Sequence, residues 1–134
     1  MNLENSQRLL SDFPRLFRLP PAYGAGEGEG AGEHFVFECG DGWIEVVHAV
    51  SRRIVAHAEE QGLYIVIHQV REEFGVLRFR MEGADAVIFR LLENAEMVSA
   101  GICEVCGAPG MLFTHGGWRV RCDLHRRLWG ERND

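Results

Sequence analysis

The sequence predicts an α+β fold in which two amphipathic helices pack on a small antiparallel sheet, followed by a C-terminal Cys3His zinc module. Two stretches with apolar residues at helical spacing flank two stretches with the alternation and β-branched content of strands. Near the end, four metal-ligand side chains stand in two tight pairs, Cys103 with Cys106 and Cys122 with His125. With 134 residues, 46% of them hydrophobic, the chain can bury one sizeable core.

The pattern divides the chain into three regions. Residues 1–33 form an N-terminal helical segment and a flexible acidic Gly-rich loop, residues 34–101 the α+β core, and residues 102–134 the zinc-binding module. The first region has apolar residues at roughly helical spacing, which predicts a short helix that ends near Asp12 and packs on the body. A partner-binding segment is the alternative interpretation. The loop at residues 22–33 has almost nothing to bury, so we expect it to be mobile.

The core is predicted to begin with a short strand at residues 34–38 and a long helix. Asp41 is the expected N-cap, because its carboxylate can accept from the free amides of the first turn. The helix then runs to about Gln61, and Gly62 ends it. Its predicted core face consists of Trp43, Val46, Val47, Val50, Ile54 and Ala58.

Residues 63–70 and 76–81 are predicted to be the two strands of a hairpin, joined by residues 71–75. Alternation sends the apolar residues of the second strand, Leu77, Phe79 and Met81, to the core. The opposite face is a candidate partner-binding surface, since arginine and tyrosine are favoured where proteins meet. A merely solvated face is the alternative. The members of this predicted face are Tyr64, His68, Arg78 and Arg80.

A second long helix is predicted to follow the hairpin. It begins at Asp85, the expected N-cap, and runs to about Ser99, and Gly101 separates it from the zinc module. Its predicted buried face consists of Ile88, Leu91, Leu92, Ala95 and Val98.

The two ligand pairs have the spacing of a tetrahedral zinc site. Two residues between ligands let the backbone form a knuckle, so that both side chains of a pair reach one ion. Two short strands on either side of residues 115–117, then a short helix with Cys122 and His125 in its first turn, complete a treble-clef or ribbon-like module. Four protein ligands leave no open position for water, which favours a structural role over hydrolysis. His115 is an alternative ligand, although a histidine in such a turn is more often solvated.

Composition restricts the compartment and the partners. Three of the four cysteines belong to the predicted site, which argues against a disulfide framework and for a reducing, cytoplasmic setting. The first twenty residues have the pattern of neither a signal peptide nor a membrane span. The net charge is −6, and residues 1–100 hold sixteen acidic residues against nine arginines. Because such a body repels a phosphate backbone, contact with nucleic acid would have to use the C-terminal region.

Several motifs together resemble a group of small proteins found in bacteria, their phages and prophages. In chain order they are Cys39-Gly-Asp-Gly-Trp43, Gln69-Val-Arg-Glu-Glu-Phe-Gly-Val-Leu-Arg-Phe79, Gly83-Ala-Asp85, Cys103-Glu-Val-Cys-Gly-Ala-Pro-Gly110, Gly117-Trp118 and Cys122-Asp-Leu-His125. The likeness covers about residues 35–125. Members of the group more often carry lysine where Arg71 and Glu73 stand and tyrosine where Arg80 stands. The resemblance implies a phage-linked cytoplasmic setting and a zinc module, but no reaction.

These features are compatible with three functions. The first is a non-enzymatic protein that binds a host or cellular protein; by analogy with other small acidic phage proteins it would inhibit a host defence system, as an anti-CRISPR protein does. The second is a regulatory zinc module that binds nucleic acid through Arg119, Arg121, Arg126, Arg127 and Arg132 with Trp118 and Trp129. The third is an enzyme that uses His48, His57 and His68 with Asp41, Glu38 or Glu45. No motif makes these residues converge, so we expect no enzymatic activity.

Overall fold

The computed structural model describes residues 1–17 and 35–133, with side chains up to residue 128. The predicted Gly-rich loop at residues 22–33 lies outside the described residues. The elements are α1 (Leu3–Asp12), β1 (Phe37–Glu38), the 3-10 helix η2 (Asp41–Trp43), α2 (Ile44–Gln61), β2 (Val66–Glu73), β3 (Val76–Glu82), α3 (Ala86–Ser99), β4 (Met111–Phe113), β5 (Arg119–Arg121) and α4 (Asp123–Asn133). None of the described helices combines the length and the apolar composition that a membrane span requires.

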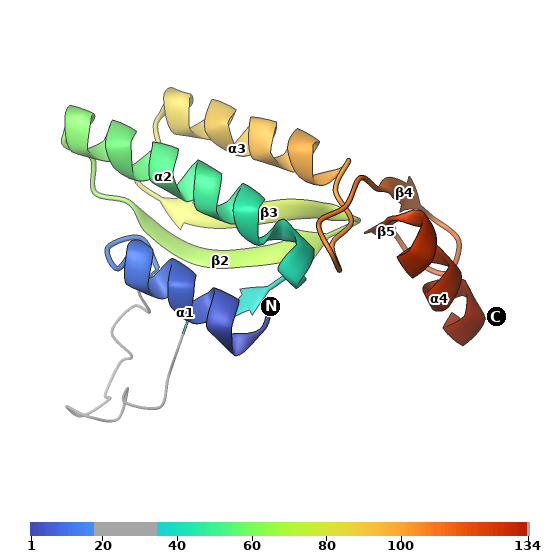
Figure 1. Ribbon diagram of the computed structural model, residues 1–134. Helices are drawn as coiled ribbons and strands as arrows, with labels where there is room; N and C mark the ends of the chain where they lie inside the picture. Colours follow the sequence, from blue (N-terminus) through green and yellow to red (C-terminus); the bar gives the residue numbers. More distant parts are fainter. Residues whose placement is uncertain (18–34, 134) are drawn as a thin grey trace, which may run out of the picture.

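The described strands form two small sheets. One has the order β1-β2-β3, and the other consists of β4 and β5. As predicted, β2 and β3 form an antiparallel hairpin, but β1 pairs with β2 in parallel, through Phe37 with Val70 and Glu38 with Arg71. The predicted antiparallel hairpin is confirmed, but the sheet that contains it is mixed, because β1 is parallel to β2. A parallel neighbour needs a crossover, and α2 is that crossover. In Figure 1 the turn of the hairpin points toward β4, β5 and α4.

The hairpin is longer and its connection tighter than the sequence suggested. The first strand was expected at residues 63–70, but β2 extends to Glu73, and the expected five-residue connection is a two-residue turn, Phe74-Gly75. The charged residues 71–73 are compatible with a strand because one face of this part of the sheet is accessible to solvent. A register irregularity between Ile67 and Gln69 adds one residue, His68, to β2.

The start of α2 also differs from the prediction. Asp41 does not cap this helix: it opens η2, and α2 begins only at Ile44. The Asp41 carboxylate accepts instead from the backbone N–H of Asn2, at 2.6 Å, and from the side-chain amide of Asn5, at 3.1 Å. It therefore ties the start of α1 to the loop before α2. At the other end Gly62 stops the helix as predicted, with a φ of 67°.

The boundaries of α3 confirm the prediction, and its buried face differs at one position. The Asp85 carboxylate caps the helix by accepting from the Ile88 N–H at 3.0 Å. Ser99 is fully buried where Val98 was expected, and Val98 is 44% exposed. The Ser99 hydroxyl accepts from the Leu77 N–H at 3.0 Å, which fastens the end of α3 to the outer edge of β3. Hydrophobic periodicity does not predict this polar contact, which sets the rotation of the last turn of α3.

The hydrophobic core lies between one face of the three-stranded sheet and the helices. All six residues of the predicted core face of α2 are buried, together with Ile67 and Val70 of β2 and Leu77 of β3. Helix α1 is joined to the first half of α2 by the ion pairs Arg8–Glu45 and Asp12–His48, each at 2.8 Å. A cluster of phenylalanine rings, Phe13, Phe17, Phe35 and Phe37, belongs to the core and begins at the residue that ends α1.

Candidate metal centre

The four predicted ligands come from three short segments that follow α3. Cys103 and Cys106 lie in the turn that precedes β4, Cys122 follows β5, and His125 lies in the first turn of α4. The first pair forms a knuckle, because the Gly107 N–H donates to the Cys103 carbonyl at 2.9 Å. Gly107 has a φ of 82°, a conformation that glycine adopts without strain. The sequence prediction of a knuckle, a hairpin and a helix is confirmed.

The ligand atoms are close enough to hold one metal ion. The Sγ atoms of the three cysteines and a ring nitrogen of His125 all lie within 4.8 Å of one another. The Cys106 and Cys122 sulfurs are 3.7 Å apart, and the Cys103 sulfur lies 3.6 Å from His125 Nδ1. In a zinc tetrahedron the sulfur–sulfur edges are about 3.8 Å and the sulfur–nitrogen edges about 3.5 Å. The Cys122 sulfur is closer, 3.2 Å from the same nitrogen.

The protonation of the thiols also suits a cation. Burial alone would raise the pKa of the Cys103 thiol, but hydrogen bonds from the backbone N–H groups of Cys122, Cys106 and Val105 lower this pKa to about 6. For Cys106 a backbone hydrogen bond from Ala108 lowers the pKa, but burial and the hydrogen bonds with Cys122 and Cys103 together raise it. One thiolate thus hinders ionisation of the next, and a bound cation relieves this conflict.

His115 and Cys39, whose side chains are of types that can bind a metal, lie apart from this cluster. His115, the alternative ligand, is exposed in the turn between β4 and β5, and is no member of the group. Cys39 is buried, as predicted, and burial raises the pKa of its thiol to about 12. The centre is therefore a Cys3His set whose members differ in exposure, with Cys103 fully buried and Cys106 at the surface.

The glycine loop, residues 39–43 before α2, packs directly against the knuckle. The Gly42 N–H donates to the backbone carbonyl of Glu104 at 2.7 Å. A Cβ atom at Gly42 would lie 2.0 Å from the Cys103 carbonyl oxygen and 2.6 Å from the Gly107 nitrogen, and one at Gly40 would lie 2.3 Å from the Glu104 carbonyl oxygen. Only glycine permits such a close approach of two backbones. The loop and the knuckle are thus fitted to each other.

Two side chains reinforce this contact. The indole N–H of Trp43, which is fully buried, donates to the Ile102 carbonyl at 2.9 Å, one residue before the first ligand. The buried Glu104 carboxylate accepts from the Gly40 N–H at 2.8 Å and pairs with Arg121 at 3.4 Å. The ligand spacing does not predict that these residues contact the centre. The motif at residues 40–43, with two glycines before Trp43, is the available signal, but nothing in the sequence indicates that it meets the knuckle.

The hairpin tip makes a second contact with the metal-binding module. Arg119 of β5 pairs with Glu72 of β2 at 2.7 Å, and the Glu72 side chain is only 15% exposed. The rings of Phe74 and Trp118 meet edge to face at 6.1 Å between centroids. Gly75 is buried against the Leu112 side chain. The module is therefore attached to the core at two places, the glycine loop and the hairpin tip.

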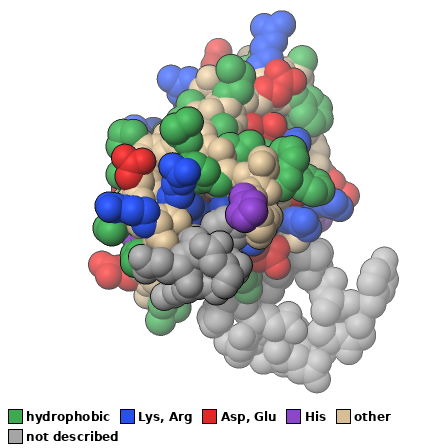
Figure 2. Space-filling view, turned by 90° about the vertical axis from the view of Figure 1, so that its right-hand side faces the viewer, with side chains coloured by type: hydrophobic (Ala, Val, Ile, Leu, Met, Phe, Trp, Pro, Cys, Tyr) green, Lys and Arg blue, Asp and Glu red, His purple; other side chains and the backbone are tan. Residues whose placement is uncertain are grey.

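The arginines predicted to contact nucleic acid are largely engaged within the protein. Arg119 and Arg121 pair with Glu72 and Glu104, and the Arg126 guanidinium lies over the Phe113 ring at 4.4 Å from its centroid. The Nε of Arg127 donates to the Asp123 carbonyl at 3.4 Å. The side chains of Trp129 and Arg132 lie outside the described residues. Figure 2 shows arginines and hydrophobic side chains interspersed at this end of the molecule.

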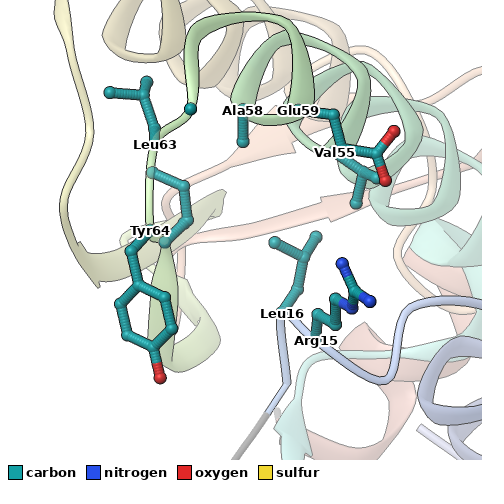
Figure 3. Close-up of a pocket in the computed structure, with 9 residues that line it drawn as sticks. Arg15, Leu16, Val55, Ala58, Glu59, Leu63 and Tyr64 are labelled. Atoms are coloured by element: carbon teal, nitrogen blue, oxygen red, sulfur yellow. The ribbon is translucent and has the colours of Figure 1, made fainter.

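Of the four residues predicted to form one face of the hairpin, Arg78 and Arg80 share a face of β3, and Tyr64 lies outside the strands. Arg78 and Arg80 are exposed on β3, and Arg78 pairs with Glu96 of α3 at 3.1 Å. His68 pairs with Glu82 at 3.2 Å. Tyr64 precedes β2 and lines a pocket instead, which has a volume of about 600 Å³. Figure 3 shows Tyr64 and Leu63 on one side of this pocket and Arg15, Val55 and Glu59 on the other.

The three histidines considered for acid–base chemistry lie in separate places. His48 pairs with Asp12 of α1, His57 with Asp85 at the start of α3, and His68 with Glu82. Of the carboxylates considered as their partners, Asp41 accepts from Asn2 and Asn5, Glu38 from Gln69, and Glu45 from Arg8. Within the described residues these groups do not form one site.

No protein-family model matches this chain. Comparison with curated proteins gives no match either. The same holds for comparison with solved structures.

Proposed function

We propose that the centre holds a structural zinc ion and that the protein acts by binding another protein, without catalysis. Three thiolates and one imidazole are the ligands that zinc prefers in closed structural sites, and a tetrahedral ion with four protein ligands has no position for a water nucleophile. The double attachment of the module to the core supports this role. An ion that fixes the module also fixes the hairpin tip and the loop before α2.

The binding role rests on large apolar side chains that are exposed where the hairpin tip meets the metal-binding module. Phe74 is 67% exposed and Trp118 48%, their rings meet edge to face, and Leu112 beside Gly75 is 39% exposed. Exposed aromatic and aliphatic side chains gathered in one place are typical of protein interfaces. Together with the resemblance to phage and prophage proteins, this supports an inhibitor of a host protein, of the kind that blocks a defence system such as CRISPR.

Binding of nucleic acid through the C-terminal arginines is the weaker alternative. Three of the arginines that it requires are held by Glu72, Glu104 and the Phe113 ring. Each would have to leave its partner before it could contact a phosphate, in a chain with a net charge of −6.

The proposal has two tests, one for the ion and one for the role. Elemental analysis of the purified protein is expected to find one zinc per chain, and His125→Ala should lose it; a wild-type protein free of zinc would refute the structural role. For the function, the purified protein is added to a host lysate and the complex is isolated by size exclusion. The partner is then purified and its activity titrated. Inhibition complete at a fixed stoichiometric ratio supports the proposal, and turnover of the partner by substoichiometric protein would refute it.

A further inference from the structure

Strand β3 lies at one edge of the three-stranded sheet, and the backbone groups of its alternate residues point away from β2. The Leu77 N–H shows which residues these are, because it donates to the Ser99 hydroxyl at 3.0 Å and not to β2. Since backbone groups alternate in direction along a strand, those of Phe79 and Met81 also point outward. Within the described residues they form no hydrogen bond outside the hairpin. An edge of this kind can pair with a further strand.

Helix α3 covers only the first part of this edge. Its last turn lies against Leu77, which is fully buried. Phe79 and Met81 point to the same face of the sheet as Leu77, yet both are only half-buried. The part of the edge beyond Leu77 therefore presents apolar side chains together with outward-pointing backbone groups.

An exposed aromatic ring lies beside this open part of the edge. Helix α3 runs back along β3, and Glu96 near its end pairs with Arg78 at 3.1 Å. Phe89 lies two turns before Glu96 on the same side of the helix, a distance of about 10 Å, which corresponds to about three residues of strand. Phe89 is thus placed near Met81, and its side chain is 55% exposed. A strand added to the edge would cover this ring.

The charges on the solvent face of β3 fit a second copy of the same strand. The exposed residues of this face are Arg78, Arg80 and Glu82. An identical strand can lie antiparallel along the edge with Phe79 opposite Met81 of the copy. Each Arg78 then stands opposite Glu82 of the other copy, so the pair forms twice. The two Arg80 side chains meet at the two-fold axis, and each has Glu82 of the other copy as a diagonal neighbour.

The neighbouring registers fit less well. A shift toward the turn of the hairpin places arginines opposite arginines twice, and it requires the Leu77 N–H, which Ser99 already holds. A shift in the other direction moves Phe79 opposite Gly83, which lies beyond the end of β3. Charge and hydrogen bonding therefore select the same register.

Both members of the pair between copies are accessible. Arg78 pairs with Glu96 within the chain, and its side chain is still 46% exposed. Glu82 pairs with His68, and its side chain is 76% exposed. A guanidinium group has several N–H donors and a carboxylate has two oxygens, so each can bind a second partner without leaving the first.

We propose that the protein forms a two-fold dimer in which the β3 strands of two copies pair antiparallel and join their sheets into one. The backbones of Phe79 and Met81 supply the hydrogen bonds, Arg78 and Glu82 fix the register, and Phe89 packs on the added strand. One pair of short strands makes a small interface, so the association is weak and depends on protein concentration. This inference is independent of the proposed function, because it requires no host protein.

Sedimentation velocity of the zinc-loaded protein tests the dimer. Between about 5 and about 300 μM we expect the wild type to pass from monomer to dimer. Arg78→Glu and Glu82→Arg each place like charges opposite each other and should weaken the dimer about tenfold, whereas the double variant should restore it. Residues 78 and 82 are about 13 Å apart along one strand, too far to touch within a chain, so this rescue reports contact between copies. Arg80→Thr removes the repulsion at the axis and should strengthen the dimer.

Arg52→Glu, at an exposed site on α2, is the matched charge control and should dimerise like the wild type. Glu82→Arg leaves the Arg78–Glu96 pair intact, so it tests the contact even if Arg78→Glu unfolds. A wild type that stays monomeric at the highest concentration, a double variant without rescue, or a dimer insensitive to every β3 variant would each overturn the inference. If Glu82→Arg is monomeric but still captures the host protein, the proposed function stands and does not depend on the dimer.

Discussion

Gly42→Ala should destabilise both the core and the metal centre. The added Cβ would lie 2.0 Å from the Cys103 carbonyl oxygen, whereas ordinary contacts begin at 3.4 Å, so the knuckle and the loop must separate by about 1.4 Å. The contact atoms belong to two backbones, and neither can rotate away. Overpacking of this kind costs about 1–3 kcal/mol, and loss of the 2.7 Å hydrogen bond from Gly42 to Glu104 about 1 kcal/mol more.

The expected loss of about 2–4 kcal/mol in the free energy of unfolding corresponds to a fall of roughly 10 °C in the unfolding temperature of a chain of this size. Calorimetry in zinc-saturated buffer measures the fall, and competition with a chromogenic chelator measures the accompanying loss of zinc affinity. Gly101→Ala is the matched control, because the nearest atom to its added Cβ is 3.8 Å away. A Gly42→Ala protein with wild-type stability and zinc affinity would refute the fitted contact between loop and knuckle.

Three further predictions follow from individual contacts. Trp43→Phe removes the donor to the Ile102 carbonyl and should cost about 1–3 kcal/mol in a denaturant titration, with weaker zinc binding; an unchanged midpoint would contradict this role. The hydrogen bond from His57 and the N–H of Ile88 hold the pKa of Asp85 below its ordinary value, so this stabilisation is present above about pH 4 and is lost as the pH falls through the folded pKa. Asp85→Asn, which keeps a capping side chain, should flatten that acid limb in stability measurements between pH 2 and pH 7, and an identical acid limb would argue against it. Chelation should accelerate hydrogen exchange at the Gly40 and Gly42 amides, measured by mass spectrometry, while the middle of α2 stays protected; exchange that is insensitive to chelation would show the two sites to be uncoupled.

Periodic patterns predicted the parts of the fold that depend on hydrophobic burial or on local backbone chemistry. The core face of α2, the stop at Gly62, the cap at Asp85 and the Cys3His cluster all agree with the structure. Each is determined by residues close together in the sequence. A helix stripe, a glycine stop, a capping carboxylate and a ligand pair can be recognised without knowledge of the rest of the chain.

The errors concern contacts between distant segments. Asp41 resembles an N-cap locally, but its carboxylate is used by Asn2 and Asn5 of a helix that precedes it by almost forty residues. Residues 71–73 are predicted to belong to the connection of the hairpin, although they lie in β2 and Glu72 is held by Arg119 of the metal-binding module. The contact of the glycine loop with the knuckle could not be predicted for the same reason, because the two segments lie about sixty residues apart. A sequence pattern identifies a turn but not the backbone that approaches it.

The hydrogen bond from Trp43 to Ile102 joins positions that are 59 residues apart. On the ribosome, the loop before α2 emerges long before the cysteines that complete its surroundings. The loop therefore lacks its backbone and side-chain partners until the segment with the four candidate ligands has been made. We expect cells deprived of zinc to degrade the whole protein and not merely its final third, so that protein abundance follows metal supply.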